Sequence, residues 1–261
     1  MGATVHTSMT ARDAVAVPKM LPTATAARPD TKAVALQAGL DVPDYLSRHY
    51  WWAYVHPNAV RLFERGWLVN LILWGNYTRL RNAALAELGE HLPGRTLQVA
   101  CVYGDLTCRL SDKIAAAGGT LDVVDVLPIQ LKNLRRKLPP HAPARLLVMN
   151  SGSMHLADAS YDRALVFFLL HEQPRKLRER TLSEVLRVVK PGGRIVILDY
   201  ALPRWWHPLR YLWRPLLAGL EPFALDLWRQ DIATWLPPVA GRNMRRDSFF
   251  GGLYQKLVVT R

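Results

Sequence analysis

The chain has 261 residues, 50% of them hydrophobic, which suits one substantial core rather than two independent domains. Its 34 Lys and Arg against 21 Asp and Glu give a formal net charge of +13, which favours polyanionic partners such as nucleic acid or anionic lipid. The sequence carries no recognisable nucleic-acid-binding motif, so we expect no nucleic-acid partner, and its longest apolar run, near Gly66–Trp74, is far shorter than the roughly 20 residues that span a bilayer.

Residues 1–40 precede the first regular hydrophobic pattern. They are rich in Ala, Thr, Val and Pro and show no sustained period, which predicts a disordered N-terminal tail. Because Asp13 and Asp30 are their only acids, a mitochondrial transit peptide is an alternative interpretation. In residues 41–92 apolar side chains recur at spacings of three and four, which predicts two or three N-terminal helices.

After Pro93-Gly94 short apolar strands alternate with helices. The expected strands are Thr96–Cys101, Thr120–Asp125, Arg145–Met149, Arg163–Phe168, Arg194–Leu198 and Tyr254–Val259. Val102–Asp105 should turn into a helix that runs to about Ala117, and the other expected helices are Ile129–Leu138 and Arg175–Val189. This alternation predicts a doubly wound, mostly parallel α/β sheet in residues 93–261, with ligands bound at the carboxyl ends of the strands.

Polar residues follow the first three strands, where a nucleoside cofactor would bind. Gly104 belongs to the loop after the first strand, where an adenosyl cofactor and an ordinary strand–helix turn both remain open interpretations. Asp125 closes the second strand about 20 residues later, where a carboxylate can accept the two ribose hydroxyls or simply order a loop. Asn150 and Ser151 follow the third strand and could bind an adenine edge or form a turn.

These motifs resemble class I S-adenosylmethionine (SAM) methyltransferases, especially the quinone-methylating branch, over residues 95–200. The resemblance is carried by "LQVACVYG" at Leu97–Gly104, "VD" at Val124–Asp125, "YD" at Tyr161–Asp162 and "VKPGG" at Val189–Gly193. It implies a Rossmann-like, seven-stranded sheet and a SAM-binding site. The cofactor-binding residues that it implies are Gln98, Ala100, Cys101, Val102, Gly104, Asp125, Val126, Asn150 and Ser151.

Three further segments resemble the rhodoquinone-biosynthesis proteins, which are methyltransferase-like, over residues 44–261. They are "WAYVHP" at Trp52–Pro57, "ILWGNY" at Ile72–Tyr77 and "LQVACVYGDLT" at Leu97–Thr107. This resemblance implies that a ring methoxy group of ubiquinone is replaced by an amino group, with SAM as the amino donor and Mn²⁺ as the supporting metal. A SAM-dependent quinone or lipid methyltransferase, and a non-catalytic quinone-binding subunit, remain as alternatives.

The loop after the first strand departs from the ordinary methyltransferase pattern. Gln98, Ala100 and Val102 stand where an acidic residue and two glycines are usual. A methyltransferase grips the α-amine of SAM, whereas an amino donor must present it. We therefore hypothesise that Tyr103 and Gln98 turn the amine towards the quinone ring.

Candidate acid–base and metal residues follow the fourth and fifth strands. His171 and Glu172 come after the fourth strand, and Asp199 and Tyr200 after the fifth, so all four should face the mouth of the pocket. We expect Tyr103, His171 and Glu172 to be catalytic, together with Tyr77 from the N-terminal helices. Carboxylate and imidazole suit Mn²⁺, which makes Asp199 and His171 the candidate ligands; a loop cap and a buried histidine are the alternatives.

Residues 203–240 combine aromatic, cationic and apolar side chains. Five of the nine Trp lie between Trp205 and Trp235, and prolines at 203, 208, 215 and 222 should break any long helix. We expect short helices that form a lid at a membrane surface, with a core-packing cap as the alternative.

The expected substrate is a ubiquinone-like lipid. The spacing of Cys101 and Cys108 matches neither a zinc site nor a disulfide framework, which favours a reducing compartment. We therefore expect a peripheral protein on the cytoplasmic face of a bacterial inner membrane, or on the mitochondrial inner membrane of a eukaryote. The oligomeric state stays open.

Overall fold

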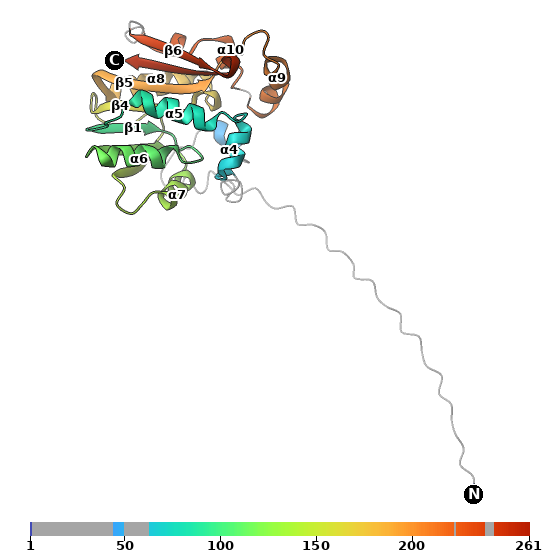
Figure 1. The fold of residues 1–261 in the computed structure, drawn as a ribbon, viewed down its shortest axis with the longest axis horizontal. Coiled ribbons are helices and arrows are strands. Elements are labelled where there is room, and N and C mark those ends of the chain that lie inside the picture. Colours follow the sequence, from blue (N-terminus) through green and yellow to red (C-terminus); the bar gives the residue numbers. More distant parts are fainter. Residues whose placement is uncertain (2–43, 50–62, 222, 238–242) are drawn as a thin grey trace. The chain divides into compact units, whose positions relative to one another are not determined.

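The computed structural model describes residues 44–49, 63–221, 223–237 and 243–261, together with Met1 (Figure 1). The expected N-terminal tail, apart from Met1, and the "WAYVHP" segment lie outside the described residues. The described residues from Asp44 onward belong to one compact unit.

Seven strands form one sheet in the order β3-β2-β1-β4-β5-β7-β6 (Figure 1). The strands are β1 (Arg95–Val99), β2 (Thr120–Asp125), β3 (Ala144–Val148), β4 (Tyr161–Phe167), β5 (Val189–Tyr200), β6 (Met244–Phe249) and β7 (Tyr254–Thr260). The strands from β1 to β5 are parallel, while β7 runs antiparallel to both β5 and β6. The predicted seven-stranded, mostly parallel α/β sheet is therefore confirmed, with its change of strand order between β1 and β4.

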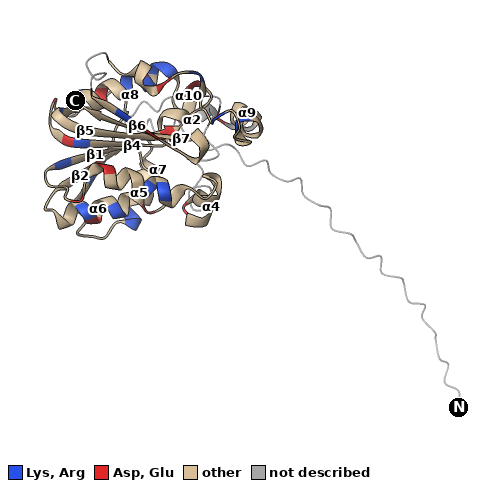
Figure 2. Ribbon diagram, turned by 45° about the horizontal axis from the view of Figure 1, so that its top comes forward, with Lys and Arg blue, Asp and Glu red and all other residues tan. Residues whose placement is uncertain are grey.

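Helices cover both faces of this sheet. They are α2 (Asp44–His49), α4 (Gly66–Ile72), α5 (Tyr77–Leu88), α6 (Leu106–Ala116), α7 (Pro128–Lys137), α8 (Arg175–Val188), α9 (Leu209–Leu220) and α10 (Asp226–Arg229), with short 3₁₀ turns at Leu170–Glu172, Ile232–Trp235 and Phe250–Gly252. Helices α6 and α7 connect β1 to β2 and β2 to β3, towards one edge of the sheet, while α8 connects β4 to β5, towards the other edge. Because such connections are right-handed, α8 lies on the face of the sheet opposite to α6 and α7 (Figure 2). Lys and Arg lie on helices of both faces (Figure 2).

The sheet supplies most of the core because its central strands are apolar on both faces. Leu97 and Val99 of β1, Leu165 of β4, and Val196 and Ile197 of β5 are fully buried. Continuous apolar strands of this kind are stable only between two helical layers. This packing fixes the carboxyl ends of the strands, where the polar residues predicted from the sequence lie.

Three local features differ from the sequence-based expectations. The segment Lys190–Gly193, expected as a tight turn, lies within β5 as an irregularity: Tyr161 pairs with Val189, but Arg163 pairs with Arg194. The edge strand β6 has no clear apolar alternation and was not predicted. In the lid, α9 continues through Pro215 although a break was expected there.

No helix within the described parts of the chain is both long and apolar enough to cross a membrane.

Candidate functional site

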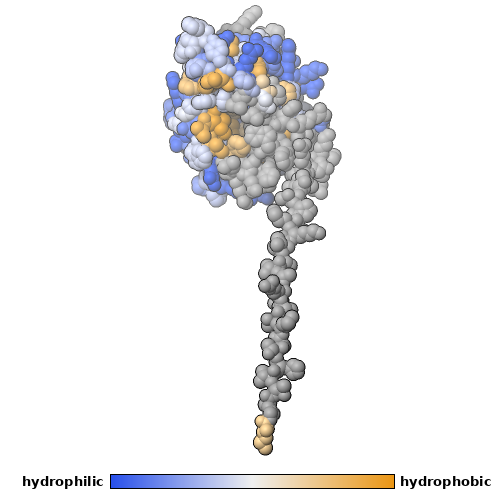
Figure 3. All heavy atoms as spheres, turned by 90° about the vertical axis from the view of Figure 1, so that its right-hand side faces the viewer, coloured by the Kyte–Doolittle hydropathy of each residue, from blue (hydrophilic) through white to orange (hydrophobic). Residues whose placement is uncertain are grey.

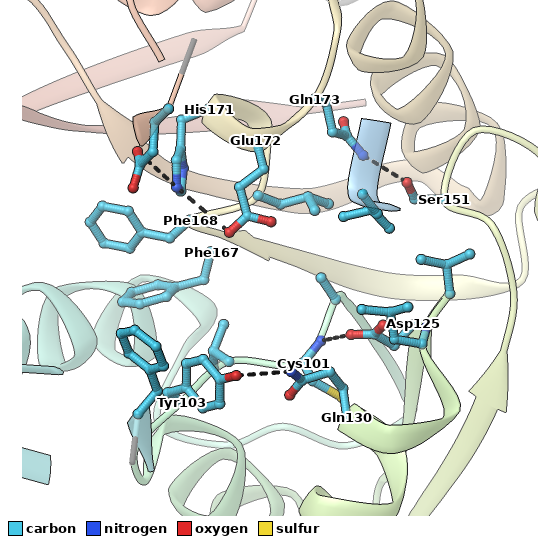
Figure 4. A pocket seen from close by; sticks show the side chains of 18 of the residues that line it. Cys101, Tyr103, Asp125, Gln130, Ser151, Phe167, Phe168, His171, Glu172 and Gln173 are labelled. Carbon is cyan, nitrogen blue, oxygen red and sulfur yellow. Dashed lines mark hydrogen bonds and ion pairs between the residues drawn. The ribbon is translucent and has the colours of Figure 1, made fainter. Parts of the chain in front are cut away.

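A cavity of about 500 Å³ lies at the carboxyl ends of β1 to β5 and is bounded on its other sides by α2, α4 and α9 (Figure 4). It brings together most of the predicted site residues. Those that line it are Tyr77, Ala100, Cys101, Val102, Tyr103, Asp125, Val126, Asn150, Ser151, His171 and Glu172. Those that do not are Gln98, Gly104 and Asp199. The volume falls within the ~300–1,000 Å³ typical of small-molecule sites.

Asp125 lies at the polar end of the cavity, at the last residue of β2. Its Oδ2 accepts the N–H of Cys101 at 2.8 Å and its Oδ1 accepts the N–H of Leu127 at 2.8 Å. Burial raises the pKa of this carboxyl to about 6, although these N–H groups oppose the shift. Each carboxylate oxygen still has a second lone pair, so Asp125 can accept hydroxyl groups from a ligand.

The loop between β1 and α6 keeps a glycine-like backbone with few glycines. Ala100 has φ +72, a conformation that ordinarily favours glycine, and its N–H donates to the carbonyl of Val124. The loop therefore passes close to the cavity even though Ala replaces the usual glycine.

Tyr77 holds this loop from α5. Its hydroxyl accepts the N–H of Leu106, the first residue of α6, at 3.1 Å, and lies 3.2 Å from an oxygen of Asp105. Burial and the charge of Asp105 raise the pKa of Tyr77 well above its usual range. Tyr77 lines the cavity, but its hydroxyl is occupied by the loop, which gives it a positioning role.

The close approach of Tyr77 explains why the loop keeps a glycine at position 104. Its φ is +85, and a Cβ built there would lie 2.4 Å from the Tyr77 hydroxyl. Gly118 also has a positive φ, +68, but a Cβ there would meet nothing within 4 Å. We expect Gly118→Ala to cost about 1–2 kcal/mol of unfolding free energy through backbone strain alone, and Gly104→Ala to cost roughly 1–3 kcal/mol more through the clash. Urea unfolding measures both; equal losses would contradict the close approach of Tyr77.

Gln98 lies outside the cavity, contrary to the hypothesis that it turns the α-amine of SAM. Its side chain is fully buried, and its Nε2 donates to the carbonyl of Ala100 at 3.0 Å and to the hydroxyl of Thr107 at 2.9 Å. The contact with Thr107 directs the Gln98 side chain towards α6, and Gln98 does not line the cavity. It supports the loop instead.

Tyr103 does line the cavity, as predicted. Its hydroxyl accepts a hydrogen bond from Nε2 of Gln130 at 2.9 Å, and its ring stacks on Phe63 with centroids 5.7 Å apart. Burial raises the pKa of Tyr103 above its usual range, so the hydroxyl stays protonated at neutral pH. Figure 4 shows the ring between the apolar end of the cavity and Gln130.

Asn150 and Ser151 form part of the wall after β3. Asn150 accepts the N–H of Gly152 through Oδ1, as in the predicted turn, while Ser151 accepts a hydrogen bond from Gln173 and contacts Thr181. Both residues therefore organise the wall through turn chemistry, and their cavity-facing positions next to Asp125 suit contacts with a base.

The other end of the cavity holds an acid–base cluster around His171. Nδ1 of His171 lies 2.9 Å from Oδ1 of Asp199, and Nε2 lies 3.7 Å from an oxygen of Glu172 and 3.7 Å from an oxygen of Glu221. Burial opposes the charged imidazole, but the carboxylates of Asp199 and Glu221 outweigh it and raise the pKa of His171 to about 9. The cluster therefore presents a protonated imidazole at neutral pH.

Asp199 does not fit the predicted metal-ligand role. Its carboxylate is fully buried and accepts the N–H groups of Leu170 and Tyr200, each at 2.8 Å, besides the bond to His171. Both oxygens are thus committed to the protein. Within the described ranges no group of three or more His, Cys, Asp or Glu is arranged to hold a metal, so the predicted Mn²⁺ site finds no support in these residues.

Asp199 should instead matter for stability. Asp199→Ala leaves two backbone N–H groups and the imidazole of His171 without their buried acceptor, and we expect it to lower the free energy of unfolding by about 3–5 kcal/mol. The matched change Asp158→Ala removes an exposed carboxylate paired with Arg187 and should cost less than about 1 kcal/mol. Similar losses in urea unfolding would contradict the role of Asp199.

Several cavity residues were missed by the sequence-based reasoning. Glu221, at the end of α9, is the only acid between Asp199 and Asp226, a signal that could have identified it. Phe168 was also missed, whereas Tyr200 lines the cavity as predicted. Both rings meet His171 edge-on, with centroids 6.0 Å away for Phe168 and 4.9 Å away for Tyr200. These ring contacts with His171 depend on the packing of strands and loops far apart in the sequence, so no local pattern predicts them.

Comparison with known proteins gives quinone-modifying relatives. The chain is 34% identical over 165 residues to the ubiquinone/menaquinone biosynthesis C-methyltransferase UbiE of Syntrophotalea carbinolica, covering 61% of this chain and 63% of that protein. It is 28% identical over 137 residues to the demethylmenaquinone methyltransferase of Lactiplantibacillus plantarum, covering 51% and 56%. The matched region thus spans less than two thirds of the length of these curated relatives.

A solved structure shows the same fold. Phosphoethanolamine N-methyltransferase 2 of Haemonchus contortus, determined in complex with SAM, superposes with a TM-score of 0.55 at 11% identity, covering 85% of this chain and 60% of that one. The ubiE/COQ5 methyltransferase family matches residues 68–212, more than half of the chain, from within α4 to the first turn of α9. The chain belongs to the ubiE/COQ5 methyltransferase family.

Proposed function

We propose that this chain transfers a group from SAM to a ring carbon of a quinone-type lipid. The observation that carries the proposal is the continuity of one cavity, which joins a buried carboxylate at the end of β2 to an aromatic chamber containing His171. The names of the two curated relatives support a quinone substrate.

The polar end of the cavity fits the nucleoside of SAM. Asp125 offers two oxygens with free lone pairs at the end of the second strand, a position that suits an acceptor for ribose hydroxyls. Val126 and Leu127 on one side and Met149 on the other provide apolar walls for the adenine. When bound, SAM supplies an electrophilic methyl group and also carries an α-amine.

The aromatic end fits a flat ring. Phe168, Tyr200 and Trp213 line it, and α9 closes it. Nε2 of His171 makes no direct hydrogen bond to the neighbouring carboxylates, since both are 3.7 Å away. It can therefore donate to an oxygen of the ring and stabilise the negative charge that develops there.

Methyl transfer is the form of the reaction that the family favours. The ring of the quinol attacks the methyl carbon, the bond from that carbon to the sulfonium sulfur breaks, and the displaced ring proton must leave. Glu172 or Glu221 lies close enough to His171 to take up that proton while His171 holds the ring oxygen. No metal is required for these steps.

Amino transfer is a second candidate. The α-amine of SAM would add to the ring carbon of ubiquinone that carries a methoxy group, and methanol would leave. Water would then cleave the bond between nitrogen and the amino-acid carbon, which would leave as a keto acid while the ring would leave as the aminoquinol. Val102 and Tyr103 place side chains at the loop that faces the methionine end of the cofactor, where glycines would leave space. Together with the sequence resemblance to rhodoquinone-biosynthesis proteins, this bulk favours a changed grip on the α-amine.

Product mass distinguishes the two forms. The protein is incubated in parallel with a demethylated quinol or with ubiquinone, using SAM labelled with ¹³C in the methyl group and ¹⁵N in the amine. Methyl transfer adds ¹³C to the ring, and amino transfer adds ¹⁵N with loss of the methoxy group. An unchanged quinone in both reactions, with SAM bound, would overturn the enzymatic proposal and leave a binding protein.

A further inference from the structure

We propose that a second cavity, between α9 and α10, binds the phosphate headgroup of an anionic phospholipid and docks the protein on a bilayer. The cavity has a volume of about 410 Å³ and is separate from the candidate SAM site. Its lining residues are Leu202, Arg210, Tyr211, Arg214, Leu225, Trp228 and Arg229.

Three arginines converge on this cavity from two helices. Arg210 and Arg214 are four residues apart on α9 and share one face of it, while Arg229 ends α10. Arg214 is exposed and forms no ion pair with the described residues. Guanidinium groups bind phosphate oxygens through paired N–H donors, so this cluster is suited to a phosphate.

The remaining contacts of these arginines leave donors available. Nη1 of Arg210 donates to the carbonyl of Pro203 at 2.7 Å, which fixes the side chain. Arg229 lies 3.8 Å from Asp226, and its side chain is 68% exposed. Among the residues that the structure describes, Asp226 is the carboxylate that pairs with one of these arginines, so three guanidinium groups against it leave the cavity cationic.

Leu202 and Tyr211 line the cationic cavity and are 43% and 63% exposed, and further exposed apolar side chains lie on the same two helices or next to them in the sequence. Trp205 is 75% exposed and Leu212 is 69% exposed, and both lie within a few residues of Arg210. On α4, Trp67 and Leu71 are 61% and 64% exposed. Figure 3 views this side of the molecule and shows hydrophobic atoms at the surface beside hydrophilic ones.

Trp74, two residues after the end of α4, makes an edge-to-face contact with Trp213 of α9, and their ring centroids are 5.2 Å apart. The exposed apolar groups of both helices, which we name the α4–α9 face, can thus contact one surface. Tryptophan and arginine beside leucine suit the headgroup boundary of a bilayer, which supplies both phosphates and an apolar layer. A free phosphate would use the arginines but leave the exposed Trp and Leu side chains without a partner.

The same two helices bound the candidate active site. Val69 and Ile72 of α4, and Leu217 of α9, line the first cavity, while the outer sides of these helices form the α4–α9 face. Docking through this face would set the aromatic chamber next to the bilayer that holds a lipid substrate. The proposed docking site consists of the second cavity and does not depend on the proposed reaction.

Vesicle flotation of the full chain tests the proposal, with vesicles of phosphatidylcholine alone or with part of it replaced by phosphatidylglycerol. We expect binding only to the phosphatidylglycerol vesicles. The triple variant Arg210→Gln, Arg214→Gln, Arg229→Gln should lower the partition coefficient on the order of 100-fold, at roughly fivefold per arginine. The control triple Lys132→Gln, Arg135→Gln, Arg136→Gln removes the same charge from exposed positions of α7 and should retain most of the binding.

The apolar contribution is tested by Leu212→Asp against Ala115→Asp, which adds the same charge at an exposed position of α6. We expect only Leu212→Asp to release the protein from the vesicles. Thermal unfolding shows whether each variant is folded. Equal losses of vesicle binding in the two triple variants would show that net charge alone causes binding. Binding of inorganic phosphate without binding to either kind of vesicle would show that the cavity takes a free anion. Each of these results would overturn the proposal.

Discussion

Asp125→Ala is expected to weaken SAM binding by roughly 100-fold or more, measured by calorimetry, because the carboxylate is the acceptor that the fold offers to the ribose hydroxyls. Loss of the side chain also leaves the N–H groups of Cys101 and Leu127 without their acceptor. Asp125→Asn keeps the size of the side chain and one acceptor oxygen, so its affinity for SAM should fall between that of the unchanged protein and that of Asp125→Ala. Asp162→Asn is the matched control: Asp162 also accepts a backbone N–H, from Arg95 at 2.7 Å, but near the amino end of β4. Wild-type affinity in Asp125→Ala would contradict the assignment.

The affinity for SAM should also depend on pH through Asp125. The pKa of its carboxyl is raised to about 6 by burial, so it is ionised at pH 7 and increasingly protonated below pH 6. Hydroxyl donors bind the ionised form more strongly, so SAM affinity should be constant above about pH 7 and fall by up to about tenfold per pH unit below 6. A flat profile from pH 5 to 8 would show that the carboxylate does not contact the ligand.

His171→Gln is expected to lower kcat by about 10²- to 10⁴-fold while the Kd for SAM stays unchanged, because His171 lies at the ring end of the cavity. His155→Gln is the control, since His155 is exposed and does not line the cavity. Equal activity of the two variants in the product-mass assay would remove His171 from the mechanism. A loss of SAM binding in His171→Gln would show instead that the cavity had collapsed.

The pH profile separates a protonated His171 from a merely structural one. Its pKa of about 9 predicts that kcat falls as pH rises through 9, because the imidazole then loses the proton that it donates to the ring oxygen. Glu221→Gln removes one of the charges that raise this pKa, so the falling limb should move to lower pH. An unmoved limb would show that Glu221 does not act on His171.

The sheet and the position of Asp125 could be predicted from the sequence because both depend on local patterns. Thr120–Asp125 is a short apolar run between turn signals, and its predicted bounds agree with those of β2. A carboxylate at the end of the second strand must lie at the carboxyl edge of such a sheet, and Asp125 lies there, in the wall of the cavity.

The roles of other residues could not be predicted because they depend on side-chain direction and long-range packing. Gln98 lies in the right strand but on its opposite face, towards Thr107. Glu221 reaches His171 only because α9 continues past Pro215 and carries it there, and the sequence had favoured a break at that proline. The expected disordered tail in residues 1–40 lies outside the described residues, so it stays a prediction.

A crystal structure of the chain with S-adenosylhomocysteine would show directly whether one cavity holds both the nucleoside and the reacting centre. We expect the ribose hydroxyls within hydrogen-bonding distance of Asp125 and the sulfur directed towards the chamber formed by Phe168 and His171. A nucleoside bound elsewhere, or a ligand whose sulfur points away from His171, would contradict it.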